Sequence, residues 1–304
     1  MIVATGFFDG VHLGHRQVIR QLVETAAARG DESMVLTFWP HPRTVLQDDA
    51  RSLRLLSTLA EKKALLTELG VDHVEGLPFS REFSRWTARE YLEEVVIGRY
   101  GGRAILLGYD NRIGSDGLDP EAIARLAASL GLDVIRPECV VGPGPLRSGN
   151  SRRSLAPDTA ISSTRIRKEL EEGRVEEAAA MLGYPYRLHG VVVAGNRLGR
   201  TIGFPTANMQ LYEPLKLVPA NGVYQVKVET LGQTYTGMCN IGVRPTVGAG
   251  NARTIETHIL DFNEDIYGLD ITISFLRKVR DERRFDSLDD LRAQLERDRA
   301  FCFQ

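Results

Sequence analysis

The first half of the chain alternates short apolar runs with amphipathic helical patterns. "IVATGFF" precedes "RQVIRQLVETAAARG", "SMVLTFW" precedes "STLAEKKALLTELG", and "RAILLG" precedes "LDPEAIARLAASLG". Helix starts are predicted at Thr58, Thr87 and Asp119, the first two with a glutamate at capping-box spacing. This rhythm is typical of a parallel sheet buried between helices. It predicts a doubly wound α/β domain that binds ligands at the carboxyl ends of its strands.

The second half has the pattern of antiparallel strands. "YRLHGVVVAG", "GVYQVKVETLGQTYTGMCNIG", "TIETHIL" and "LDITISF" often alternate apolar and polar residues, and "TLGQ" is typical of a hairpin turn. An antiparallel barrel or a sandwich is therefore expected. The closing segment "SLDDLRAQLERDRA" predicts an amphipathic helix that packs through Leu288, Leu291 and Leu295.

The change of pattern places a domain boundary near residue 184. We expect one domain over residues 1–183, ending in the helical segments "STRIRKELEEG" and "VEEAAAMLG", and a second over residues 184–304. Residues 141–160 are poor in large apolar side chains and rich in Gly, Pro, Ser and Arg, which predicts a loop or linker.

Composition narrows the class of protein. The 304 residues carry a net charge of -2, which gives no global field for nucleic acid or an anionic membrane. The three cysteines form no CxxC pattern, and no apolar stretch is long enough to span a bilayer. We expect a cytoplasmic protein that binds neither nucleic acid nor membrane, and that is a monomer or a weak homo-oligomer.

The stretch "TGFFDGVHLGHR" lies where the first strand gives way to the first helix. Backbone N–H groups and the helix dipole favour an anion at such a position. Gly6, Gly10 and Gly14 would let a phosphate approach the backbone, and His12 and His15, three residues apart, would project from one side of the helix. A metal-binding pair is the weaker alternative, because His41 is the one further histidine nearby.

A second segment of the first half suits a polyphosphate. "ISSTRIRKEL" places hydroxyl groups at Ser162, Ser163 and Thr164, at a helix start, with Arg167 in the first turns. Hydroxyls, backbone N–H groups and a guanidinium form a natural phosphate clamp. The alternative is a well-capped helix with a solvated basic face.

The second half offers oxygen ligands and a carboxylate. In "GNRLGRTIGFPTANM", Thr206 and Asn208 are hard oxygen donors suited to Mg²⁺ with ATP, and "ETHILDF" places Glu256 in a strand. The alternatives are a structural turn and an exposed strand carboxylate.

The motifs together resemble one enzyme family. "GFFDGVHLGH" and "ISSTRIR" are similar to the signatures of the HxGH nucleotidyltransferase superfamily, and "GRTIGFPTAN", "NIGVRPT" and "ETHI" resemble riboflavin kinase. Both in one chain are the arrangement of the bacterial bifunctional riboflavin kinase and FAD synthetase family. The resemblance implies a Rossmann-like nucleotidyltransferase domain, then a β-barrel kinase domain. It also implies two ATP-dependent reactions with Mg²⁺, from riboflavin to FMN and from FMN to FAD.

The resemblance also implies roles for individual residues of the first half. Charge-stabilising catalytic roles fall to His12, His15 and Arg167. ATP contacts fall to Gly6, Phe7, Asp9, Gly10, Ser162, Ser163 and Thr164. Flavin contacts fall to Phe38, Pro40, His41, Pro42 and Asp110.

In the second half Glu256 is the implied base for the ribityl hydroxyl. ATP contacts are implied for Gly195, Arg200, Gly203 and Pro205, Mg²⁺ ligation for Thr206 and Asn208, and flavin contacts for Arg280 and Phe285.

One segment departs from the family pattern. "GYDNRIG" has Asn111 and Ile113 where the family has aromatic residues, although Asp110 is kept. Either FMN binds weakly in this half or the pocket is rebuilt around Trp39 or Tyr109. Two alternatives therefore stay open at this point: a riboflavin kinase whose first domain is impaired or takes another substrate, and a non-enzymatic flavin-binding module.

Overall fold

The computed structural model describes residues 1–46, 53–108, 112–137, 161–195, 198–245 and 251–303. Its contacts divide the chain into two compact units, Met1–Ser163 and Thr164–Gln304. The predicted loop of residues 141–160 lies outside the described residues.

A parallel sheet forms the centre of the first unit. Its described strands are β1 (Ile2–Thr5), β2 (Ser33–Trp39), β3 (His73–Pro78), β4 (Ala104–Leu106) and β5 (Asp133–Ile135). They pair in the order β3-β2-β1-β4-β5, each pair parallel. The strand order reverses between β1 and β4, the point where a doubly wound sheet binds its ligand. The predicted fold is confirmed.

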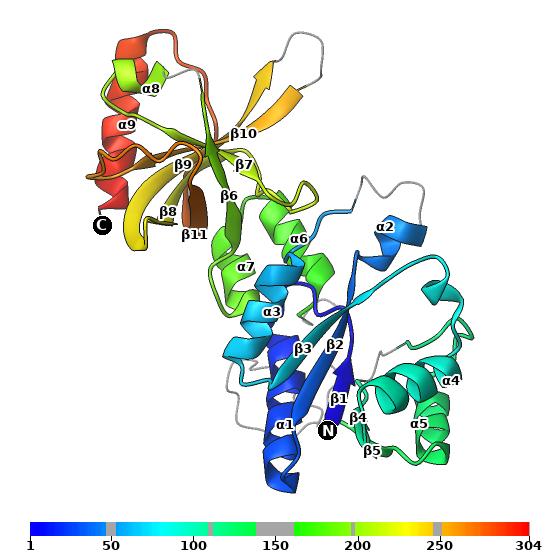
Figure 1. The fold of residues 1–304 in the computed structure, drawn as a ribbon. Coiled ribbons are helices and arrows are strands. Elements are labelled where there is room, and N and C mark those ends of the chain that lie inside the picture. The colour runs from blue at the N-terminus through cyan, green and yellow to red at the C-terminus, as the bar shows by residue number, and fades with distance from the viewer. Residues whose placement is uncertain (47–52, 109–111, 138–160, 196–197, 246–250, 304) are drawn as a thin grey trace, which may run out of the picture. The chain divides into compact units, whose positions relative to one another are not determined.

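Helices cover both faces of this sheet. They are α1 (Leu13–Arg29), α2 (Pro42–Leu46), α3 (Leu59–Glu68), the 3₁₀ helix η2 (Phe83–Arg85), α4 (Ala88–Glu90), the π-helix η3 (Tyr91–Arg99) and α5 (Pro120–Ser129). Helices α1 and α3 lie on one face of the sheet, and α4 and α5 on the other (Figure 1). The predicted capping boxes at Thr58 and Thr87 and the N-cap at Asp119 are confirmed.

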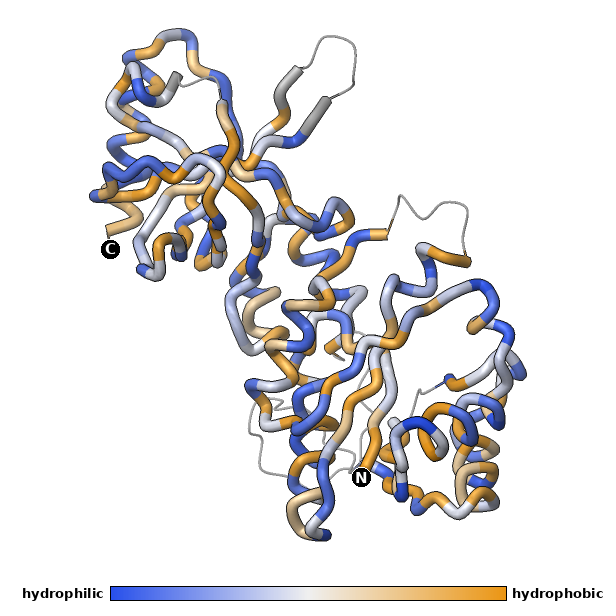
Figure 2. Tube along the Cα trace, in the orientation of Figure 1, coloured by the Kyte–Doolittle hydropathy of each residue, from blue (hydrophilic) through white to orange (hydrophobic). Residues whose placement is uncertain are grey.

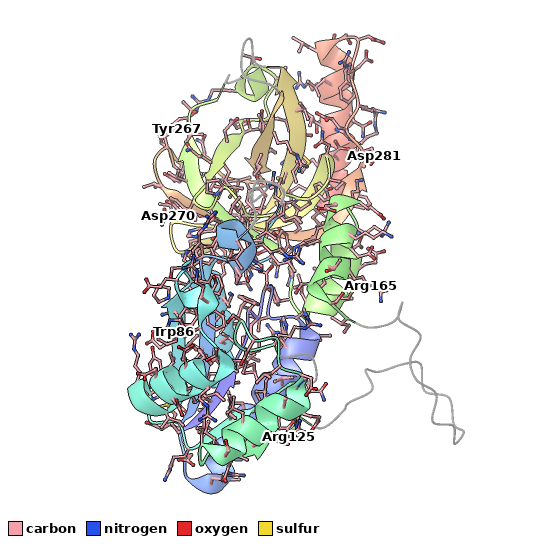
Figure 3. The ribbon with its side chains drawn as sticks, turned by 90° about the vertical axis from the view of Figure 1, so that its right-hand side faces the viewer. Trp86, Arg125, Arg165, Tyr267, Asp270 and Asp281 are labelled. Carbon is pink, nitrogen blue, oxygen red and sulfur yellow. The ribbon has the colours of Figure 1, made fainter. Side chains whose placement is uncertain are left out.

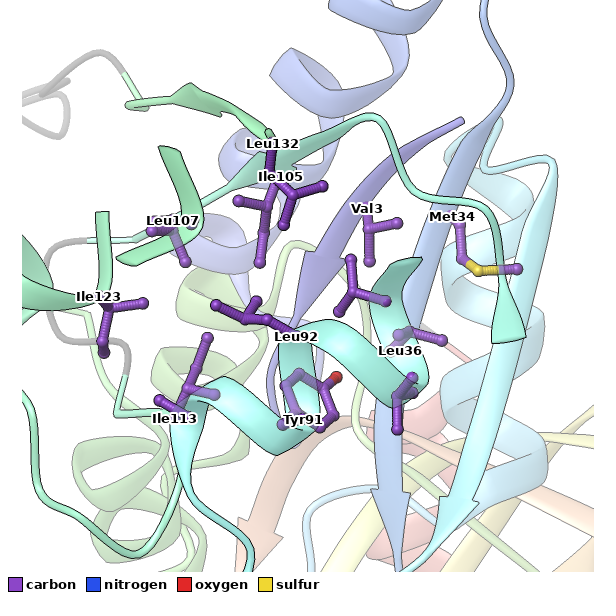
Figure 4. Packing of buried hydrophobic residues seen from close by; sticks show 14 of the residues in the cluster. Val3, Met34, Leu36, Tyr91, Leu92, Ile105, Leu107, Ile113, Ile123 and Leu132 are labelled. Carbon is purple, nitrogen blue, oxygen red and sulfur yellow. The ribbon is translucent and has the colours of Figure 1, made fainter. Parts of the chain in front are cut away.

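The core of this unit fills the space between the sheet and its helices. Figure 2 shows hydrophobic residues along β1, which is fully buried. On one face the side chains of Val3, Leu36 and Ile105 pack against Tyr91 and Leu92 of η3 (Figure 4). This packing holds the carboxyl ends of β1 and β2 at one edge of the sheet.

The second unit contains a closed antiparallel barrel. Its strands are β6 (Arg187–Val193), β7 (Ala207–Leu211), β8 (Gly222–Thr230), β9 (Gln233–Pro245), β10 (Asn251–Ile259) and β11 (Asp270–Arg280), in the order β10-β7-β6-β11-β8-β9. The pairing of β10 with β9 closes the barrel, which excludes the sandwich. Leu231 and Gly232 both have positive φ, so the predicted β8–β9 hairpin turn is confirmed.

The helices of this unit are α6 (Ser163–Glu171), α7 (Val175–Leu182), α8 (Leu198–Thr201) and α9 (Leu288–Cys302). The contacts group α6 and α7 with the barrel, because α7 packs on β11 and the Ala220 N–H donates to the Leu170 carbonyl oxygen. The sequence placed both helices in the first domain, and the boundary at residues 183/184 stays a prediction.

The predicted apolar face of α9 is partly wrong. Leu288, in the first turn of the helix, is 54% exposed. Leu295 packs against Phe204, Met238 and Cys302 as expected. The contact with the barrel therefore forms through the second half of the helix.

Candidate functional site

The loop between β1 and α1 has a strained backbone. Phe8 and Val11 have φ angles of 46° and 37°, although both carry bulky side chains that are buried. Such a conformation costs of order 1–3 kcal/mol per residue and persists only where surrounding contacts enforce it. Strain of this kind is typical of a ligand site.

Asp9 supplies the enforcing contacts. Its carboxylate accepts hydrogen bonds from the backbone N–H groups of Leu56 and Ser57 and from the Ser57 hydroxyl, at 3.0–3.2 Å. The Gly10 N–H donates to Ser57 Oγ at 2.9 Å. These contacts tie the loop to the segment before α3, so Asp9 orients the turn, and its predicted contact with ATP stays a prediction.

His12 is the N-cap of α1. Its Nδ1 accepts a hydrogen bond from the His15 N–H at 3.3 Å, and the two imidazole rings stack with their centroids 3.7 Å apart. Because Nδ1 accepts, the neutral His12 ring carries its proton on Nε2. A Cβ at Gly14 would lie only 3.2 Å from this ring, so the absence of a side chain at Gly14 leaves room for the imidazole.

His15 is held neutral. Burial lowers its pKa well below 6.5, and the charges of His12 and Lys62 lower it further. Its Nδ1 is buried without a hydrogen-bond partner in the described structure. Buried polar atoms are rarely left unpaired, which marks the start of α1 as a place where a polar ligand completes the structure.

Two of the residues predicted to contact the flavin, Phe38 and His41, lie against the ring of Phe7. The Phe7 ring is 38% exposed and stacks on His41 at 5.1 Å, and its centroid lies 5.4 Å from that of Phe38. Phe38 also contacts Phe79 and Phe83, which the sequence analysis missed. The repeated aromatics of "FSREFSRW", which end at Trp86 (Figure 3), could have revealed them.

The altered segment contributes to the core. Ile113 is 7% exposed and packs with Leu92 and Ile123 (Figure 4). Its aliphatic side chain therefore fills the interior of the unit. Tyr109, Asp110 and Asn111 lie outside the described residues.

The second phosphate motif touches the first. Ser163 begins α6, as predicted, and its hydroxyl donates to the Asp9 carbonyl oxygen at 3.0 Å. Ser162 precedes it in the first unit. Thr164 and Arg167 belong to the second unit, and their contacts with ATP stay predictions.

In the barrel, strand register gathers the predicted polar residues. Glu256 of β10 stands opposite Asn208 of β7 and opposite Asn240 of β9. Directly opposed residues share a face of the sheet. Thr206 stands immediately before β7, which begins at Ala207. Sequence analysis missed Asn240, although it begins the quoted motif "NIGVRPT".

The segment before β7 is fixed by tight contacts. A Cβ at Gly195 would fall within 2.2 Å of the Asn208 amide nitrogen, so the Asn208 side chain lies against this glycine. Phe204 is buried in the barrel core. His258 Nδ1 donates to the Pro205 carbonyl oxygen at 2.8 Å, which places the ring proton on Nδ1.

A pocket of about 270 Å³ opens beside Pro205 and Thr206 and is lined by Ala207 and Thr257, whereas Asn208 and Glu256 are not part of its lining. The predicted Arg200, Pro205 and Thr206 form part of its wall. The segment from Phe262 to Tyr267 also lines the pocket, and the sequence analysis did not assign it (Tyr267 is labelled in Figure 3). Its run "FNEDIYG", with two aromatics and two carboxylates between two strand-like segments, was the available signal.

Arg280 makes contacts within the protein. Its Nε donates to both Asp298 carboxylate oxygens at 2.9–3.1 Å, which ties β11 to α9, and its guanidinium lies 5.7 Å from the centre of the Phe285 ring. The assignment of Arg280 and Phe285 to flavin binding stays a prediction.

Comparisons with known proteins agree with both halves. Residues 1–141 match the FAD synthetase family model and residues 182–303 match the riboflavin kinase model. The bifunctional riboflavin kinase/FMN adenylyltransferase of Listeria monocytogenes is 36% identical over 98% of this chain and 90% of its own length. That of Bacillus subtilis is 34% identical over the same shares.

The chain belongs to the bifunctional riboflavin kinase/FMN adenylyltransferase family. Both enzymatic domains of that family are present, so the alternatives of a kinase alone and of a non-enzymatic module are not supported. A crystal structure described as a macrolide-efflux protein from Streptococcus pneumoniae has a TM-score of 0.85 and 32% identity, and it covers 100% of this chain and 93% of its own. That match supports the fold.

Within the described residues no helix has the length and apolarity needed to cross a membrane.

The family's reactions use ATP, whose phosphates commonly bind a divalent cation, and several residues of the barrel could hold such a cation. Asn208 offers a carbonyl oxygen on the strand face that carries Glu256, and Thr206, immediately before that strand, offers a hydroxyl. Hard oxygen donors of this kind fit Mg²⁺. Among the residues that the structure describes, no cluster of His, Cys, Asp and Glu suits a transition metal.

Proposed function

We propose that the two reactions of this enzyme are divided between the two units. FMN adenylylation takes place at the loop of residues 6–15, and riboflavin phosphorylation takes place where Thr206 precedes the barrel face that carries Asn208 and Glu256. The observation that carries the second assignment is the register of β10 with β7, which sets the candidate base opposite a candidate metal ligand.

In the kinase reaction Glu256 accepts the proton of the ribityl 5'-hydroxyl. The hydroxyl oxygen bonds to the γ-phosphorus of ATP, the bond to the β-phosphate oxygen breaks, and ADP leaves. Phosphoryl transfer of this kind depends on positioning and charge neutralisation more than on covalent help. The pocket lined by Arg200, Thr206 and Tyr267 has the volume to take part of the nucleotide, and Thr206 connects it to the proposed metal site.

Mg²⁺ would be held by Thr206 and Asn208. When bound, it neutralises charge on the phosphate oxygens. Arg200 lies in the wall of the same pocket, where its guanidinium attracts the phosphates, and Gly195 leaves room for the Asn208 amide.

In the adenylyl transfer a phosphate oxygen of FMN bonds to the α-phosphorus of ATP, and pyrophosphate leaves. His12 donates from Nε2 to the phosphate oxygens, and His15 offers its buried nitrogen. Donors aimed at developing charge in a water-poor site lower the barrier without a covalent intermediate. The exposed Phe7 ring, with Phe38 and His41 beside it, offers an aromatic surface to the isoalloxazine.

We further propose a cytoplasmic enzyme whose partners are flavins and ATP. Cys239 and Cys302 are free and buried, and burial raises the pKa of the Cys239 thiol to about 12, which suits a reducing compartment. The net charge of -2 gives no support to nucleic acid or membrane binding. A monomer or a weak homo-oligomer stays the prediction for its assembly.

The test is to incubate the purified protein with riboflavin, ATP and Mg²⁺ and to separate the flavins by chromatography. FMN followed by FAD is expected. FMN that accumulates without FAD would remove the adenylylation site from this proposal, and unchanged riboflavin would remove the kinase site.

A further inference from the structure

A lysine ammonium is buried next to the histidine loop. Lys62 of α3 is only 4% exposed, and its Nζ donates to Thr37 Oγ1 at 3.0 Å. Thr37 Oγ1 donates in turn to the Phe7 carbonyl oxygen at 3.2 Å. One hydroxyl therefore connects the buried ammonium to the backbone of the loop. Because desolvation of an ammonium costs several kcal/mol, packing alone does not explain a lysine here.

The groups around Lys62 show what its charge acts on. Burial lowers the pKa of Lys62 to about 8 and Asp9 opposes that shift, so the ammonium is mostly protonated at neutral pH. His15 is faced by His12 from the start of its own helix and by Lys62 from α3. Burial is the largest cause of the lowered pKa of His15, and His12 and Lys62 lower that pKa further. The lysine is thus within electrostatic range of His15 on one side and of Asp9 on the other.

We propose that Lys62 is a positioning residue of FMN adenylylation, whose buried positive charge steadies the loop through Thr37 and attracts phosphate groups to His12 and His15. This inference rests on the adenylylation site proposed above. A fixed charge acts more strongly in a water-poor interior than at the surface. It also keeps the two stacked imidazoles from becoming a pair of like charges, so that they serve as hydrogen-bonding groups.

The decisive variant is Lys62→Met, which keeps the length of the side chain and removes the charge. The variant is expected to fold, because an apolar side chain avoids the desolvation cost. Thermal unfolding and riboflavin kinase activity on the same chain check this.

We expect kcat/KM for FMN adenylylation to fall at least tenfold, with KM for ATP rising most. The low-pH limb of its pH profile moves to higher pH, because loss of the neighbouring positive charge makes His15 easier to protonate.

Two matched variants separate charge from structure. Lys62→Arg keeps the charge and is expected to keep the low-pH limb in its wild-type position. Thr37→Val removes the connecting hydroxyl but leaves the charge, so a smaller fall is expected, without movement of the limb. The inference is overturned if Thr37→Val reproduces both the fall in kcat/KM and the shift of the low-pH limb. It is also overturned if kcat/KM of Lys62→Met stays within twofold of the wild-type value and the low-pH limb of its profile does not move.

His15→Ala, assayed in parallel, separates this inference from the proposal on which it rests. If His15→Ala still makes FAD at the wild-type rate, the adenylylation site itself is misplaced. If His15→Ala is inactive and Lys62→Met is not, only the role of Lys62 is lost.

Discussion

The two units present their proposed catalytic groups in opposite ways. In the first unit they stand on a strained loop, with Phe8 and Val11 at positive φ and with His15 desolvated. In the second they stand on regular strands, where Asn208 and Glu256 are opposed by register and partly exposed. A strained loop depends on every contact that enforces it, whereas each strand residue is placed by the ladder itself. Substitutions that disturb the loop should therefore act through geometry as well as chemistry, and those on the barrel strands through chemistry alone.

The largest effect is expected at the barrel. Glu256→Gln removes the proposed base and keeps the shape of the side chain, so FMN formation from riboflavin should fall about 10²–10⁴-fold. FAD formation from supplied FMN should stay near the wild-type rate. Both are measured by chromatography of the flavins. Glu229→Gln, an exposed glutamate of β8, is the matched control and should leave both rates unchanged. Equal loss of both activities in Glu256→Gln would refute the division.

The complementary experiment removes the imidazole of His15 from the loop between β1 and α1. His15→Ala should lower FAD formation about 10²–10³-fold, as the loss of a charge-stabilising donor does elsewhere, and should preserve riboflavin phosphorylation. His73→Ala is the control, since that histidine is 43% exposed and faces Glu32. Full FAD synthesis by His15→Ala would exclude the histidine from the reaction.

A smaller change tests the geometric claim. Gly14→Ala adds one methyl group 3.2 Å from the His12 ring, so the imidazole must shift by a few tenths of an ångström. We expect FAD formation to fall about tenfold, because small misplacements of a catalytic group are costly. Glu24→Ala, at an exposed position of the same helix, should change nothing. Equal rates for the two variants would show that the position of His12 is not critical.

The smallest effect concerns pH and stability. The folded first unit keeps His15 unprotonated well below pH 6.5, whereas the unfolded chain binds a proton near 6.5. The unfolded state therefore binds more protons as the pH falls below 6.5. The free energy of unfolding of this unit should decrease there by up to about 1.4 kcal/mol per pH unit. Urea unfolding at pH 7.5 and 5.5 measures this decrease. His15→Gln should reduce it, and an unchanged decrease would assign the effect to other groups.

Periodicity was enough to predict the parallel sheet, the antiparallel strands and the helix starts, because each depends on local patterns, whereas it left a barrel and a sandwich both open. The hairpin at Leu231 and the capping box at Thr58 are examples. The exposure of Leu288 could not be predicted, since it depends on which turn of α9 meets the barrel.

The same limit applies to the sites. Motifs identified His12, Asp9 and Glu256, but they did not reveal that Lys62 reaches Phe7 through Thr37, or that Asn240 stands beside Glu256. Those relations join residues far apart in sequence. They arise from tertiary packing and strand register, which no local pattern encodes.

The division of the two reactions has one direct test. Glu256→Gln and His15→Ala are mixed in equal amounts with riboflavin, ATP and Mg²⁺, and the flavins are followed by chromatography over time. Neither variant alone should convert riboflavin to FAD, whereas the mixture should, because one supplies FMN and the other adenylylates it. FMN that accumulates without FAD, or riboflavin that stays unchanged, would contradict the assignment of one reaction to each unit.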